Sequence, residues 1–123
     1  MQLIKRLIWK LRGVTVWHYC NVSMKAKIGK GTSIGSYTEI GPNVIIGENV
    51  RIGAKCFIPE GVEIKDNAWI GPCCTFSNDI YPPSSKESWR RTVIDEGAVL
   101  GLGVSVLAGR YVAKKTIVAQ GSY

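Results

Sequence analysis

The sequence predicts an all-β protein in which short parallel strands wind into stacked coils. Three observations support this prediction: an apolar residue recurs at every sixth position, glycine directly follows many of these residues, and a second small or apolar residue lies two positions before each. Six residues is too short a period for an antiparallel sandwich, whose turn signals recur about every 8 to 12 residues. A fixed short period is typical of a solenoid, in which equivalent side chains stack from coil to coil.

Residues 1–12 are expected to form a basic amphipathic helix before the coils begin. Apolar side chains at helical spacing form one face: Leu3, Ile4, Leu7, Ile8 and Leu11. Cations take the other face, Lys5, Arg6, Lys10 and Arg12, and Gly13 ends the helix. Two interpretations remain open: the helix caps one end of the solenoid, or it makes a peripheral membrane contact through residues 1–12. We therefore divide the chain into a helix at 1–13 and a coil domain at 14–123.

The coil domain carries the six-residue register without a miss from Val22 to Phe76. Its members are Val22, Ile28, Ile34, Ile40, Ile46, Ile52, Ile58, Ile64, Ile70 and Phe76. The register breaks at Pro82 and Ser88, and it then resumes in the same phase as Ile94, Leu100, Val106, Val112 and Val118. The sequence therefore predicts one array from which a single loop, at about 78–91, is extruded.

The positions two before the register are also expected to face inward, because alternate residues of a strand point the same way. They are Ala26, Thr32, Thr38, Val44, Val50, Cys56, Val62, Ala68, Cys74, Thr92, Ala98 and Val104. Turns should follow each strand at glycine or proline.

Charge is distributed unevenly along the chain. The whole sequence has 16 basic and 9 acidic residues, a net charge of +7, and residues 1–30 carry seven Lys or Arg and no acid. The rest is balanced, with 9 of each sign, so we expect no nucleic-acid partner for the coil domain. Four cysteines without C-x-x-C spacing indicate reduced thiols and a cytoplasmic protein, and no apolar run reaches the roughly 20 residues of a membrane span.

The repeat resembles that of the hexapeptide-repeat acyltransferases. This resemblance implies a left-handed parallel β-helix with three hexapeptides in each coil, which corresponds to about five coils here. Stepping by 18 residues then stacks Ile28, Ile46 and Ile64 in one column, continued by Ile94 and Val112.

The predicted loop resembles that of one subgroup in particular. The matching residues are Ser77-Asn78-Asp79-Ile80-Tyr81-Pro82 and Trp89-Arg90-Arg91-Thr92. That subgroup acetylates the amino group of nucleotide-linked amino sugars, such as a dTDP-3-amino-3,6-dideoxyhexose or a UDP-3-amino sugar, for lipopolysaccharide and other surface polysaccharides. The resemblance implies that Tyr81, Trp89 and Arg90 bind the substrate. Pro83 stands where the subgroup commonly has an arginine.

Asn78 and Asp79 are the candidate catalytic residues. An O-acyltransferase needs a general base to deprotonate its hydroxyl, usually a histidine near this loop, whereas the only histidine here is His18. A deprotonated amine is already a good nucleophile and mainly needs positioning. Asp79 could accept a proton or hold the amine, and Asn78 could orient it. The alternative interpretation is that both residues form an Asx turn that begins the loop.

By the same resemblance, the acyl donor is acetyl-CoA, held by backbone at small residues of the later coils. The matching positions are Gly101, Gly103, Ala108, Gly109, Ala119 and Gly121. Lys114 and Lys115 could pair with CoA phosphates, or form a solvated corner of the coil. No metal is expected, because one histidine cannot supply a zinc cluster.

The resemblance also implies a homotrimer with sites between subunits. Two further functions stay open. The chain could be a sugar O-acetyltransferase that uses His18, or a catalytically inactive trimeric scaffold.

Overall fold

The computed structural model describes residues 3–122 as one short helix followed by sixteen strands and a short 3-10 helix. The helices are α1 (Leu3–Leu11) and η1 (Lys86–Ser88). The strands are β1 (Thr15–Val16), β2 (Asn21–Val22), β3 (Lys27–Ile28), β4 (Ser33–Ile34), β5 (Glu39–Ile40), β6 (Ile45–Ile46), β7 (Arg51–Ile52), β8 (Phe57–Ile58), β9 (Val62–Ile64), β10 (Trp69–Ile70), β11 (Thr75–Phe76), β12 (Thr92–Ile94), β13 (Val99–Leu100), β14 (Ser105–Val106), β15 (Tyr111–Val112) and β16 (Ile117–Val118).

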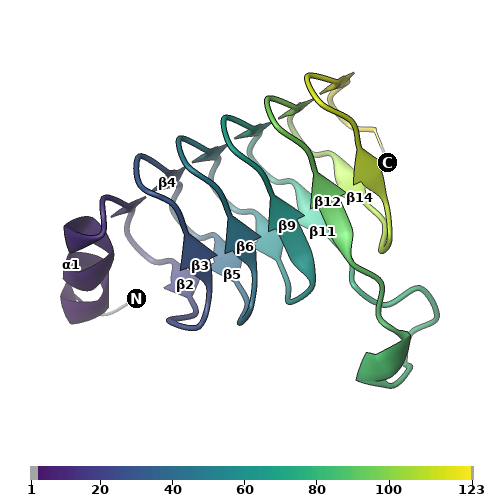
Figure 1. Cartoon of the computed structure of the whole chain (residues 1–123), viewed down its shortest axis with the longest axis horizontal. Helices are drawn as coiled ribbons and strands as arrows, with labels where there is room; N and C mark the ends of the chain where they lie inside the picture. Colours follow the sequence, from purple (N-terminus) through teal and green to yellow (C-terminus); the bar gives the residue numbers. More distant parts are fainter. Residues whose placement is uncertain (1–2, 123) are drawn as a thin grey trace.

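Every strand pairs in parallel with the third strand before or after it, so the chain forms a parallel β-helix with three sheets (Figure 1). One sheet has six strands, in the order β1-β4-β7-β10-β13-β16, and the other two have five each. The pairing joins register residues 18 apart, such as Ile34 with Ile52, and the step becomes 30 across the loop, where Ile64 meets Ile94. The predicted columns are confirmed.

The stack begins one hexapeptide earlier than Val22, so the sheet that contains β1 has six strands, one more than the five coils expected. Val16 is buried and pairs with Ile34, and Val14 and Cys20 fill the inward positions two before Val16 and Val22. Trp17 and Ser23 follow these first two register residues, so the isoleucine–glycine signature is absent there. The left-handed winding stays a prediction.

Both inward positions of each hexapeptide form the core, as expected. The register residues from Ile34 to Val106 are almost fully buried, and so are the residues two before them. Several small inward side chains also bind the next coil: the hydroxyls of Thr32 and Thr38 donate to the carbonyls of Gly47 and Gly53, at 2.8 and 2.9 Å. These bonds satisfy backbone groups at the coil corners, which stacking would otherwise leave unpaired.

Glycine follows the register isoleucines because the coils approach most closely there. A Cβ on Gly53 would lie 2.5 Å from the backbone nitrogen of Pro72, one coil further, and a Cβ on Gly35 would lie 2.6 Å from that of Ala54. Any larger residue would force the coils apart.

Helix α1 covers the N-terminal end of the stack (Figure 1). It packs through Trp9, which is 1% exposed, while the Nε of Arg6 donates to the carbonyl of Val16 at 3.0 Å. Most of the apolar stripe expected from the sequence faces solvent instead: Leu3, Ile4, Leu7 and Leu11 are exposed, and Ile8 is half-buried. No helix in residues 3–122 has the length and apolarity that crossing a bilayer requires.

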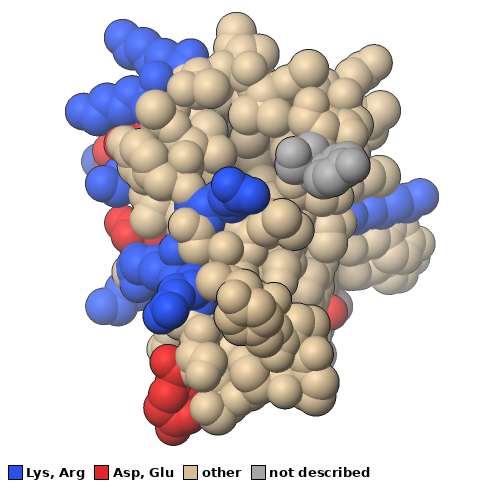
Figure 2. Space-filling model, turned by 90° about the vertical axis from the view of Figure 1, so that its right-hand side faces the viewer, with Lys and Arg blue, Asp and Glu red and all other residues tan. Residues whose placement is uncertain are grey.

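The predicted loop leaves the stack between β11 and β12 and contains η1 (Figure 1). At the C-terminal end, the last coil leaves an open apolar cavity of about 250 Å³, lined by residues that include Leu100, Val106, Val112 and Val118. Figure 2 views this end, where most of the surface is uncharged and basic side chains gather along one side.

Candidate active site

The candidate site lies where the extruded loop, residues 77–91, meets the turns that follow β8, β11 and β14. We call this edge of the β-helix the loop corner. The 18-residue period places Glu60 of one coil directly before Asn78 of the next, and the 12-residue insertion then places residues 107–110 beyond the loop. Residues from three successive coils therefore meet there.

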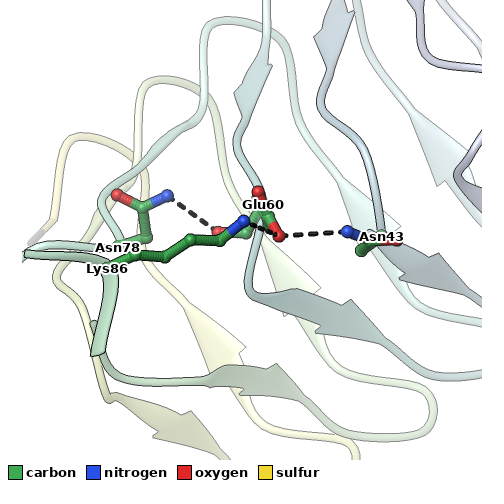
Figure 3. A network of polar contacts seen from close by, with 4 residues as sticks. All are labelled: Asn43, Glu60, Asn78 and Lys86. Atoms are coloured by element: carbon green, nitrogen blue, oxygen red, sulfur yellow. Dashed lines mark hydrogen bonds and ion pairs between the residues drawn. The ribbon is translucent and has the colours of Figure 1, made fainter. Parts of the chain in front are cut away.

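Glu60 attaches the loop to the preceding coil at two points (Figure 3). The side-chain amide of Asn78 donates to the Glu60 carbonyl at 2.8 Å. The Glu60 carboxylate forms an ion pair of 2.8 Å with the Lys86 ammonium in η1, and it accepts a hydrogen bond of 3.0 Å from Asn43. The Lys86 and Asn43 contacts hold the pKa of Glu60 below its ordinary value. Asn78 thus has a structural task beside any catalytic one.

The returning end of the loop is attached in the same way. The Arg91 guanidinium donates through two nitrogens to one carboxylate oxygen of Glu63, at 2.8 and 3.1 Å. The backbone nitrogen of Arg90 donates to the Asn78 carbonyl at 3.3 Å, which closes the base of the loop.

Asp79 organises the beginning of the loop. Its carboxylate accepts the backbone N–H of Tyr81 at 3.1 Å, the N–H of Ser84 at 2.9 Å and the Ser84 hydroxyl. These contacts, the Ser84 hydroxyl first, lower the pKa of Asp79. A carboxylate held in this way stays ionised at neutral pH, so it is suited to attracting a cationic group and poorly suited to taking up a proton. The contact with Tyr81, two residues on, is the Asx turn named as the alternative interpretation.

A cavity of about 290 Å³ separates the start of the loop from the following coil. It is lined by Ser77, Asp79, Ile80, Leu107, Ala108 and Arg110. The cavity thus brings a carboxylate and a guanidinium to one apolar-walled space, an arrangement that can bind a polar ligand in a fixed orientation.

The three expected substrate-binding residues differ in position. Tyr81 is 80% exposed in the first part of the loop. Trp89 is half-buried, and its indole nitrogen is buried without an acceptor within residues 3–122. The Cβ of Arg90 lies 3.0 Å from where a Cβ on Gly109 would be, so the Arg90 side chain crosses that glycine.

The expected acetyl-CoA positions lie on three different corners of the β-helix. Ala108 and Gly109 are at the loop corner, beside the cavity. Gly101, Gly103, Ala119 and Gly121 lie in the turns after β13 and β16. Lys114 and Lys115 lie in the turn after β15, where the backbone N–H of Lys115 donates to the Glu96 carbonyl at 3.0 Å. Only Ala108 and Gly109 are therefore brought together with Asn78, Asp79 and Arg90.

Glu60 and Arg110 belong to the loop corner, but the sequence analysis did not single them out. Counting 18 residues back from Asn78 leads to Glu60, and counting 30 forward from Ile80 leads to Arg110. The same steps of 18 and 30 residues that stack the core isoleucines also stack the corner residues. Applied to the corners, these steps would have identified both Glu60 and Arg110.

Three of the four cysteines, Cys20, Cys56 and Cys74, belong to the core, and Cys73 is exposed. All four cysteines are free, and the Cys56 and Cys74 thiols donate to the carbonyls of Gly71 and Gly101 at 3.2 Å each. Within residues 3–122, no three His, Cys, Asp or Glu side chains gather in a way that could hold a metal ion.

The fold and its loop define a parallel β-helix of hexapeptide repeats, and comparison with protein families agrees. The family model described as GMPPB C-terminal domain matches residues 16–122, so the chain belongs to the GMPPB C-terminal domain family. Among curated proteins none matches the chain.

Solved structures that are similar to the chain include acetyltransferases. One is the acetyltransferase domain of PglB from Neisseria gonorrhoeae in complex with acetyl coenzyme A, 15% identical, with a TM-score of 0.57 over 93% of this chain and 61% of that one. Another is a mutant of perosamine N-acetyltransferase from Caulobacter crescentus in complex with CoA and GDP-perosamine, 16% identical, with a TM-score of 0.49 over 95% and 59% of the two chains.

This chain spans about three fifths of the length of each of these two proteins. At 15% identity the likeness to the PglB domain establishes the shared fold alone. The resemblance to hexapeptide-repeat acyltransferases is confirmed at that level.

Proposed function

We propose that the chain is an acetyl-CoA-dependent N-acetyltransferase acting on a nucleotide-linked amino sugar in cytoplasmic synthesis of surface polysaccharide. The observation that carries this proposal is the cavity at the loop corner, where Asp79 and Arg110 line one space beside the small residue Ala108. The fold is also that of an acetyltransferase domain crystallised with acetyl coenzyme A.

Asp79 is proposed to attract and orient the sugar amine. A free amine in solution is largely protonated, so an ionised carboxylate binds it favourably before reaction. The bound ammonium first releases one proton to solvent. The neutral amine nitrogen then forms a bond to the thioester carbonyl carbon, the carbon–sulfur bond breaks, and the CoA thiolate leaves with the second proton that the nitrogen loses. This role needs Asp79 as a charge in a fixed position, which agrees with its low pKa and its three hydrogen bonds.

Arg110 lines the cavity, and Arg90 lies against Gly109, next to the lining residue Ala108. We propose that they pair with phosphate of the nucleotide or of CoA, because guanidinium groups match phosphate oxygens in geometry as well as charge. The more distant lysines, Lys114 and Lys115, would then contact CoA only where a neighbouring subunit of a homotrimer brings their corner to the loop.

The test is acetyl transfer to dTDP- and UDP-linked amino sugars, measured as release of the CoA thiol. Asp79→Asn should lower kcat/KM by about 100-fold, since it removes the charge that positions the amine. Asp66→Asn is the matched control, because Asp66 also accepts a backbone hydrogen bond, from Glu48 at 2.8 Å, but on another corner. Equal activity of the two variants would remove Asp79 from the mechanism.

The matching family is described as a C-terminal domain and not as a transferase, so we keep a second candidate, a catalytically inactive trimeric scaffold whose role is assembly. A thermal unfolding series with acetyl-CoA separates the two functions. An enzyme should be stabilised increasingly as acetyl-CoA exceeds its Kd, because a ligand that binds only the folded state stabilises it. An unchanged midpoint at millimolar acetyl-CoA would support the assembly role.

The O-acetyltransferase alternative depends on His18. That residue lies in the turn after β1, three coils before the loop and on another corner. His18→Ala should therefore leave transfer unchanged, and a large loss of activity would favour O-acetylation with a base from a neighbouring subunit.

A further inference from the structure

Helix α1 displays an apolar stripe to solvent. We call this stripe the outward face and define it as Leu3, Ile4, Leu7 and Leu11, which are 75, 70, 54 and 82% exposed. Four large apolar side chains side by side on an exposed helix are unusual for a surface that meets only water.

The orientation of α1 is fixed by contacts on its opposite side. At 100° per residue, Trp9 points away from the outward face, and its ring is buried against the first coil. Arg6 donates to the Val16 carbonyl at 3.0 Å, and the Arg12 guanidinium lies 5.1 Å from the centre of the Trp9 ring. The helix therefore cannot turn its leucines inward without removing Trp9 from the core.

The charges around the outward face have one sign. At 100° per residue Lys10 lies next to Leu3, Lys5 and Arg12 are exposed farther round the same helix, and residues 1–30 contain seven cations and no acid. Two copies that met through this face would bring these cations together with no acid nearby to pair with them. An anionic surface, in contrast, complements both the apolar stripe and its flanks.

An aromatic side chain extends the same surface onto the first coil. Trp17 is 53% exposed, and it lines a groove of about 270 Å³ together with Leu3, Leu7 and Lys10. Tryptophan beside leucine and lysine is typical of segments that lie at the boundary between lipid headgroups and acyl chains.

We propose that the outward face of α1, together with Trp17, binds the surface of an anionic membrane. The helix lies in the plane of the headgroups, its leucines enter the upper acyl region, and Lys5 and Lys10 pair with lipid phosphates. The stack then projects from the membrane with its loop toward the far end (Figure 1). This proposal does not depend on the proposed catalytic activity.

The test is sedimentation of the intact protein with vesicles. We expect binding to vesicles of phosphatidylcholine with 30–40% phosphatidylglycerol (roughly the anionic excess that cationic segments need), little binding to pure phosphatidylcholine, and weakening with added salt. Leu11→Glu should reduce the binding constant for vesicles by at least about tenfold. It removes an apolar side chain that the acyl region would bury, and it adds a negative charge that the anionic lipids repel. Ile117→Glu is the matched control, since Ile117 is 77% exposed on the last strand and changes charge equally.

Replacing two lysines of α1 tests whether electrostatic attraction to anionic lipid contributes to binding. Lys5→Gln with Lys10→Gln should weaken binding by about fivefold for each cation removed. Lys55→Gln with Lys65→Gln, which removes two exposed lysines of the coil domain, should change binding much less.

Tryptophan quenching by brominated lipid locates the contact. Quenching should be lost in Trp17→Phe and kept in Trp69→Phe. Equal vesicle binding by Leu11→Glu and Ile117→Glu, or no binding to anionic vesicles at all, would overturn the proposal. Loss of self-association in Leu11→Glu without any vesicle binding would overturn it in favour of a second copy as the occupant.

Discussion

Single side chains at the loop corner can serve both the proposed reaction and the structure of the loop. Asp79 is a candidate site residue, yet its hydrogen bonds with Tyr81 and Ser84 also shape the loop. Asn78 likewise binds the backbone of Glu60. Variants of these residues therefore need a structural readout beside activity.

Asp79 supplies such a readout through its titration. Its pKa is lowered in the folded protein, so its contacts are present above about pH 4 and are lost as pH falls through the lower, folded-state value. We predict that the backbone N–H resonance of Ser84 shifts with a midpoint below about pH 4 and is flat in Asp79→Asn. A midpoint near pH 6 would mean that Asp79 is a proton acceptor in a different environment.

Thr38 shows how the core depends on single hydroxyls. Its oxygen donates to the Gly53 carbonyl at 2.9 Å and accepts the N–H of Cys56 at 3.3 Å. Thr38→Val keeps the shape but leaves both groups without a partner, so we expect a loss of about 1–3 kcal/mol in the free energy of unfolding by urea. Thr75→Val, at an exposed strand position, should cost much less. Equal effects of the two variants would contradict the role of this hydroxyl.

At the scale of elements, the distance between coils is the property most sensitive to substitution. Gly53→Ala should destabilise the fold by about 1–3 kcal/mol, because its Cβ would meet the Pro72 backbone at 2.5 Å. Gly103→Asn is the contrasting change: nothing lies within 4 Å of a Cβ there, and Asn49 and Asn67 adopt the same left-handed backbone elsewhere. Thermal unfolding should show a large decrease for the first variant and a small one for the second.

The strands could be predicted from the sequence because each register residue meets its equivalent one coil away. The register, together with the three hexapeptides per coil that the family resemblance implies, placed Ile34 against Ile52, and the interruption of the register placed the loop. The first hexapeptide, which contains Val16, was missed because Trp17 follows Val16 and the isoleucine–glycine signature begins only at Ile28.

The site and the orientation of α1 were less accessible to sequence reasoning. Contacts such as Lys86 with Glu60 depend on how the loop folds back, which no local period encodes. The helical spacing identified the apolar stripe, but Trp9 on the cationic side decided which face is buried.

At the scale of the whole molecule, the expected homotrimer should be visible as mass. The outer faces of two sheets carry partly exposed aromatic side chains, Phe57 at 42% and Trp69 at 43%, which association would cover. Light scattering should therefore give three times the 13.5 kDa of one chain. A mass of 13.5 kDa at micromolar concentration would contradict the trimer and any site shared between subunits.

Because the coils stack in a single direction, the ease with which a coil opens locally depends on its position along the axis of the β-helix. Each coil contacts only its two neighbours, so fluctuations that release a coil begin at the ends of the array. Trp9 covers the first coil, whereas Val112 and Val118 of the last coil are only half-buried. Backbone amides should accordingly exchange with solvent fastest at the C-terminal end and slowest in the central coils, which makes the β-helix a graded structure whose two ends differ in lifetime.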